Sequence, residues 1–242
     1  MRFLLVLVLG ISACSPPPKV PKPEAVPLVL HPSLETDRER LQSAVDSART
    51  ALRAFAESYG WGEWVKEEFM DSVMVFDDKA LFDKALLTLS GADTSMQLPP
   101  TYFAALERRV LIVMSPGYCA RVYPEGNEPG SYPKLLAHEM AHRLHIRILG
   151  GNEEAMGPTW FFEGFAIFAA GQFANSPLQL SNQEVVDVLS ERERGSYLRY
   201  NYCFRYFVNQ SDLKTLVVHA GRPGFSDSLI ATNRKNAERL QP

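Results

Sequence analysis

The 242-residue sequence has few cysteines and no excess of positive charge. Three cysteines cannot form a disulfide framework, and a chain of this length can bury a full core without one. The net charge of −3 supplies no electrostatic footprint for nucleic acid, so we expect no nucleic-acid partner. No internal repeat and no sustained heptad occurs, which excludes solenoids and coiled coils. These absences leave one ordinary globular domain.

Much of the most concentrated hydrophobicity lies in the first dozen residues. Arg2 precedes an apolar run at 3–9, and small residues lead up to Cys14. This pattern predicts a secretory signal over 1–13, because the run is too short to span a bilayer. The Ile-Ser-Ala-Cys ending resembles the lipobox of bacterial lipoproteins. That resemblance implies a lipidated Cys14 that anchors the chain to a membrane of the bacterial cell envelope.

Residues 14–33 are rich in proline and predict an extended tether between the anchor and a folded domain at 34–242. Ser15, by resemblance to sorting rules of Gram-negative bacteria, implies the outer membrane, facing the periplasm. Within the domain, 34–108 carries no motif of its own, whereas 109–242 contains the residues discussed below.

The folded part has an α+β pattern. Apolar residues at helical spacing predict a helix over 34–59, and a second helix is expected over 79–89. Runs rich in β-branched residues predict strands at 72–76 and 109–114. From 131 onward the chain is expected to be helical. A small mixed sheet followed by a mostly helical half is typical of the α+β class.

One motif carries chemistry: His138-Glu139-Met140-Ala141-His142, in a stretch without helix breakers. Residues four apart share a helix face, so His138 and His142 can bind one metal ion from one turn. Glu139 points about 100° away from His138, where its carboxylate reaches a water beside the metal rather than the metal itself. The pattern predicts a metal site with Glu139 as its base.

Glu163 is the expected third metal ligand. It lies in an apolar run that predicts a helix buried on nearly every face, and no Lys, Arg or His occurs between Arg147 and Arg192. An unpaired carboxylate there would cost several kcal/mol. Either a divalent metal or an Arg distant in the sequence compensates for its charge, or the side chain extends from the helix end into solvent.

An HExxH motif followed by Glu163 in a W-x-x-E-G-x-A setting resembles the gluzincin branch of zinc metallopeptidases, in particular its small bacterial peptidase MA-like members. The resemblance covers about 110–240 and implies a thermolysin-like core. It implies one Zn²⁺ per chain on His138, His142 and Glu163, with Glu139 as general base. Metzincins are disfavoured, because residues 145 and 148 are His and Ile rather than Gly and His.

The implied activity is hydrolysis of peptide bonds in a peptide or protein substrate, and no aminopeptidase motif is visible, which favours an endopeptidase. Family members commonly use a Tyr or His from a later helix to stabilise the oxyanion. Alignment favours Tyr197 for this role, with Tyr200 as its rival. A non-catalytic envelope lipoprotein and a zinc hydrolase of a non-peptide substrate are the alternatives, although the intact Glu139 argues against the former. The oligomeric state is not predicted.

Several further residues have more than one interpretation. Cys119 and Cys203 can form a disulfide or remain free thiols. The 109–114 strand is either a core strand or one that pairs with extended substrate. His145 is expected to be structural or to support a ligand, and Glu153 and Glu154 to be solvated.

Overall fold

The structure is a computed structural model that describes residues 25–239, with only the backbone described for 235–239. The predicted signal and Cys14 lie outside the described residues. In the described part, no helix combines the length and the apolar character needed to cross a membrane.

The sheet has four strands, β1 (Leu28–Leu30), β2 (Ser72–Phe76), β3 (Ala104–Glu107) and β4 (Val110–Met114), in the order β1-β2-β4-β3. β1 and β4 run parallel to β2, whereas β3 is antiparallel to β4. The predicted strands at 72–76 and 109–114 are confirmed. The tether boundary at residue 33 is wrong, because β1 lies within 14–33 and belongs to the sheet.

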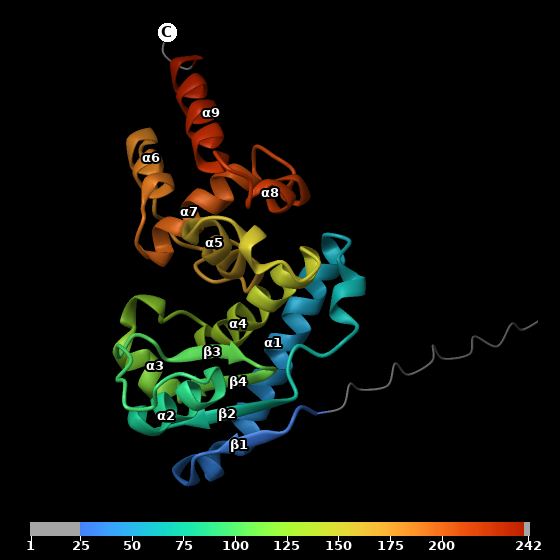
Figure 1. Cartoon of the computed structure of the whole chain (residues 1–242), viewed down its shortest axis with the longest axis vertical. Helices are drawn as coiled ribbons and strands as arrows, with labels where there is room; N and C mark the ends of the chain where they lie inside the picture. Colours follow the sequence, from blue (N-terminus) through green and yellow to red (C-terminus); the bar gives the residue numbers. More distant parts are fainter. Residues whose placement is uncertain (1–24, 240–242) are drawn as a thin grey trace, which may run out of the picture.

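Alternation along the strands divides the core between the two faces of the sheet. On one face, Val73, Val75, Leu111 and Val113 join the main core with α1 (Arg38–Ser58) and α4 (Ser131–Ile148). On the other face, Ile112 and Met114 pack against Phe82 and Leu86 of α2 (Lys79–Ser90). The sheet is therefore a middle layer between helices (Figure 1).

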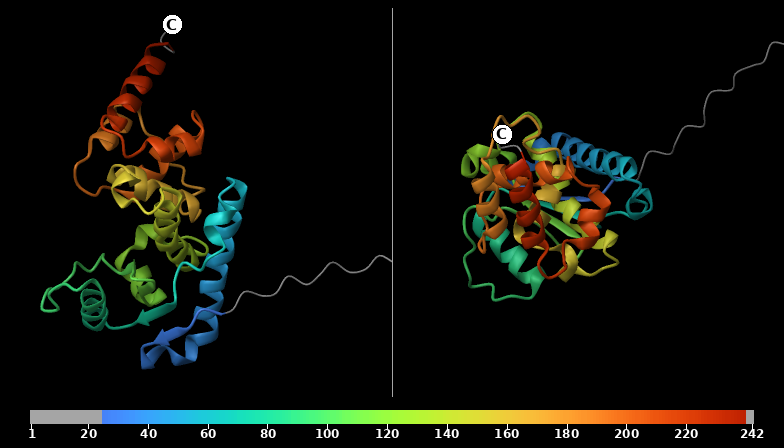
Figure 2. Two further views of the ribbon diagram at one scale, coloured as in Figure 1. Left: turned by 45° about the vertical axis from the view of Figure 1, so that its right-hand side comes forward. Right: turned by 90° about the horizontal axis from the view of Figure 1, so that it is seen from above.

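The C-terminal half is helical, as predicted. Its helices are α5 (Thr159–Ala169), α6 (Asn182–Ser190), α7 (Tyr197–Val208), α8 (Leu213–His219) and α9 (Phe225–Arg239). The remaining elements are α3 (Pro116–Val122) and the short 3-10 turns η1 (Pro32–Asp37), η2 (Gly62–Val65), η3 (Pro124–Gly126) and η4 (Glu153–Met156). Figure 2 shows the last helices gathered at the end of the molecule away from β1. The α+β prediction is confirmed.

α5 is the central helix of this half and packs against both α4 and α7. Most of its apolar residues are buried, including Trp160, Phe161 and Phe165. The helix approaches α7 closely at Gly164, where an added Cβ would lie 2.9 Å from the Cβ of Phe204. Glycine at this position therefore allows the close contact between the two helices.

Cys119 and Cys203 are free thiols, the first half-buried in α3 and the second buried in α7. Burial raises the pKa of each thiol to about 12. Of the two interpretations of this pair, the structure has the free-thiol form.

Candidate metal centre

α4 supplies two imidazoles that face one another. His138 is buried and His142 half-buried, and their Nε2 atoms lie 3.1 Å apart. Helical spacing of four residues places both rings on one face, as the sequence predicts.

Glu163 joins them from α5, because α5 packs along α4. Its side chain is 1% exposed, and its Oε2 atom lies 3.2 Å from Nε2 of His138 and 3.6 Å from Nε2 of His142. The potential ligand atoms of the three residues all lie within 4.8 Å of one another. This group of two imidazoles and one carboxylate could hold a metal ion.

The protonation pattern around the group fits a cation. Nδ1 of His138 lies 2.8 Å from the amide oxygen Oε1 of Gln172, so Nδ1 donates and, in the neutral ring, the Nε2 lone pair is directed at the group. In the described part of the chain, Oε2 of Glu163 has no hydrogen-bond partner. Nε2 of His142 lies at hydrogen-bond distance from Nε2 of His138, so either a proton or a metal ion between these atoms relieves the repulsion within the group.

The electrostatics point the same way. Burial alone would lower the pKa of His138, but the Glu163 and Glu139 carboxylates raise it above its ordinary value. Burial alone would raise the pKa of Glu163, but the two imidazoles hold it far below its ordinary value. The site therefore stabilises a negative Glu163 and draws a positive charge to it.

Glu163 has a cation as well, from a distant part of the sequence. Nη2 of Arg194, in the loop between α6 and α7, donates to Oε1 of Glu163. Of the two ways to compensate Glu163, the distant Arg is therefore present on one oxygen, while the other oxygen faces the imidazoles. Although the sequence has no cation between Arg147 and Arg192, folding brings Arg194 to Glu163.

Glu139 lies beside the group without belonging to it. Its half-buried carboxylate lines a cavity of about 480 Å³ that His138, Gln172 and Arg194 also line. Among the side chains that the structure describes, none hydrogen-bonds to Glu139, although the charges of His138 and Arg194 interact with it. Its carboxylate therefore lines the cavity without a fixed hydrogen-bond partner.

Tyr197 and Tyr200 occupy different environments. The Tyr197 ring stacks on the His138 ring at 5.6 Å between centroids and lines the cavity. The Tyr200 hydroxyl instead accepts a hydrogen bond from the backbone N–H of Gly195 and is not among the lining residues. The structure therefore brings Tyr197 to the candidate site and uses Tyr200 to hold the adjacent loop.

Most of the cavity wall is aromatic or aliphatic. It includes Tyr102, Phe103, Tyr123, Tyr132 and Leu135. β3 borders the cavity through Ala104, whereas the predicted substrate strand at 109–114 is β4, which pairs with β2 on one side and β3 on the other. The substrate-strand interpretation of 109–114 is therefore wrong, because both of its edges are already hydrogen-bonded; the described edge nearest the site is β3.

The other predicted residues lie outside the ligand group. His145 is fully buried against the Phe161 and Phe165 rings. Glu153 and Glu154 are exposed, as expected for solvated side chains. Sequence reasoning missed Gln172 and Arg194, and neither lies in a motif that distinguishes it from other polar residues.

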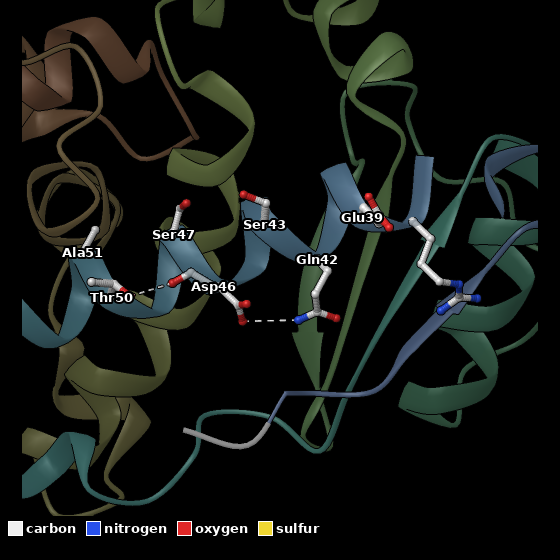
Figure 3. Close-up of a pocket in the computed structure, with 8 residues that line it drawn as sticks. Glu39, Gln42, Ser43, Asp46, Ser47, Thr50 and Ala51 are labelled. Atoms are coloured by element: carbon white, nitrogen blue, oxygen red, sulfur yellow. Dashed lines mark hydrogen bonds between the residues drawn. The ribbon is translucent and has the colours of Figure 1, made fainter. Parts of the chain in front are cut away.

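A broader hollow lies over α1, away from the imidazoles (Figure 3). Its lining runs from Arg38 to Ala51 and comes from this one helix. Its polar side chains bond along the helix, as Gln42 does to Asp46. It is the solvent face of an amphipathic helix and brings no groups together from different elements.

Comparison of the chain with known protein families, curated proteins and solved structures finds no match.

Proposed function

We propose that this protein is a zinc-dependent peptidase whose ligands are His138, His142 and Glu163. The observation that carries the proposal is that two imidazoles and a buried carboxylate place one possible ligand atom each within 4.8 Å of one another. Two imidazoles and one carboxylate are a ligand set that zinc enzymes use for catalysis. When bound, Zn²⁺ supplies Lewis acidity toward water and toward the carbonyl oxygen of the substrate.

Glu139 is the proposed general base. Its carboxylate follows His138 directly on α4, lines the same cavity and has no described hydrogen-bond partner. It takes the proton from the attacking water and passes it to the leaving amine, so that one residue serves both halves of the reaction.

Tyr197 is the proposed donor to the oxyanion. Burial raises the pKa of its phenol well above the ordinary value, and the negative charge of Glu163 raises it further. The hydroxyl therefore keeps its proton and can donate a hydrogen bond to the developing negative charge.

The cavity supports a peptide substrate with an apolar side chain next to the cleaved bond. Its wall is mainly aromatic and aliphatic, and β3 offers a strand edge along which extended peptide backbone can pair. We propose cleavage within a peptide or protein chain. The signal, the lipidated Cys14 and the outer-membrane location facing the periplasm complete the proposal on the strength of the N-terminal sequence.

The test compares bound zinc and peptide turnover in the native protein and in Glu139→Gln. The variant should keep stoichiometric zinc and lose activity by roughly 10²–10⁴-fold, the usual contribution of a general base. Glu154→Gln is the matched control, because Glu154 is exposed and does not line the cavity. Absence of zinc would refute the metal site, and zinc without Glu139-dependent peptide turnover would refute the peptidase.

A further inference from the structure

The two oxygens of Glu163 have different surroundings. Oε1 accepts a hydrogen bond from Nη2 of Arg194. Oε2 has no hydrogen-bond partner in the described part and lies 3.2 Å from Nε2 of His138. A carboxylate can bind a metal through one oxygen or through both, so the partner of Oε1 decides which mode is open.

Arg194 is held in place from both sides. The next residue, Gly195, donates its N–H to the hydroxyl of the buried Tyr200, and that hydroxyl lies 3.5 Å from the carbonyl oxygen of Glu193. The Arg194 guanidinium also lies over the Tyr197 ring, 5.9 Å from its centroid. The loop on either side of Arg194 is thus fixed to the first turns of α7, and its cation is directed at Glu163.

We propose that Arg194 is a positioning residue that makes Glu163 a one-oxygen ligand. This inference rests on the proposed metal site. The guanidinium occupies Oε1 and adds positive charge on that side, so only Oε2 is presented to the metal. Arg194 thereby keeps the protein ligands to three donor atoms, which leaves a position for water and substrate.

A second effect follows from charge. A carboxylate that shares its negative charge with a guanidinium donates less charge to a metal on its other oxygen. A metal in this site is therefore a stronger Lewis acid than the same metal would be on a carboxylate without a guanidinium partner. Partners of ligands tune metal sites in this way, and their removal typically changes affinity by about 10–100-fold.

Cobalt(II) provides a probe of this arrangement, because its visible absorption is stronger in four-coordinate than in five-coordinate sites. The full chain is titrated with Co²⁺ as native protein, Arg194→Met and Arg194→Lys. Arg194→Met keeps an apolar side chain over the Tyr197 ring but has no hydrogen-bond donor. The Arg194 side chain is 52% exposed, so the position tolerates the change. Arg194→Lys restores one charged donor.

We expect Arg194→Met to absorb less strongly, as Glu163 turns to bind through both oxygens, and to bind Co²⁺ about 10–100-fold more tightly, because the carboxylate regains the charge that the guanidinium withdraws. Arg194→Lys should return most of the way to the native affinity and absorption. Arg192→Ala, in the same loop and exposed, should match the native protein. Circular dichroism confirms that each variant is folded.

The outcomes separate the two proposals. If the native protein binds no Co²⁺, the metal site itself is refuted. If the native protein binds Co²⁺ and Arg194→Met gives the same affinity and spectrum, the positioning role of Arg194 is refuted while the metal site stands. A change in Arg194→Met that Arg194→Lys does not reverse would also contradict the role assigned to its hydrogen bond.

Discussion

His145 offers a quantitative test of how burial acts on the helix that carries the candidate ligands. It lies on α4, is 0% exposed, and its ring is 4.4 Å from the Phe165 ring between centroids. Neither ring nitrogen has a hydrogen-bond partner among residues 25–239. Burial, with a smaller effect of His142, lowers its pKa from 6.5 to about 3.

The folded and unfolded states bind different numbers of protons at His145 at acidic pH. Between pH 6.5 and about 3, the unfolded chain binds a proton at His145 that the folded protein does not bind. The free energy of unfolding therefore falls as the pH falls through this window, by about 1.4 kcal/mol per pH unit. From pH 7.5 to pH 4.5 the loss through His145 amounts to about 2.7 kcal/mol.

His145→Leu removes the titrating group and keeps an apolar side chain against the two phenylalanines. Urea unfolding of both proteins at pH 7.5 and 4.5, with chelator present, measures the effect. All other groups titrate in both proteins, so the difference between them isolates His145. We expect the stability of His145→Leu relative to the native protein to rise by about 2–3 kcal/mol at the lower pH. Parallel pH profiles would refute the reasoning.

Two further predictions concern the site and its support. Tyr197→Phe should lower kcat by roughly 10²–10³-fold with unchanged zinc content, as expected for loss of one oxyanion donor; steady-state peptide hydrolysis measures this, and a native kcat would exclude Tyr197 from the reaction. Gly164→Ala should destabilise the protein by about 1–3 kcal/mol, because its Cβ would lie 2.9 Å from Phe204 and force α5 away from α7. Denaturant unfolding of Gly164→Ala measures this loss. A denaturation midpoint equal to that of the native protein would contradict the prediction.

Periodicity predicted the long elements well. The β-branched runs at 72–76 and 110–114 and the helical spacing in α1 are strong signals, because each element buries one face against the core. β1 and β3 were missed because they are edge strands of three and four residues, too short to show alternation. β1 also follows a proline-rich segment, which favoured the tether interpretation.

Some residues of the candidate site could likewise be predicted from the sequence, and others could not. His138 and His142 follow from a spacing of four on one helix, and Glu163 follows from the cost of burying a carboxylate in an apolar helix. Gln172 and Arg194 reach the site through packing of α5 against α4 and through the loop before α7. Contacts of this kind depend on how helices pack, and no local pattern in the sequence encodes them.

The sheet order also sets the direction from which a substrate arrives. The described chain enters the fold at β1, and the candidate site opens beside β3, at the opposite edge of the sheet. Three strand spacings, about 14 Å, separate these edges. A lipid on Cys14, as proposed, would attach the molecule to the membrane from its β1 side, with the candidate site at the other edge of the sheet. The proposed activity would then act on chains in the surrounding space more readily than on segments within the membrane.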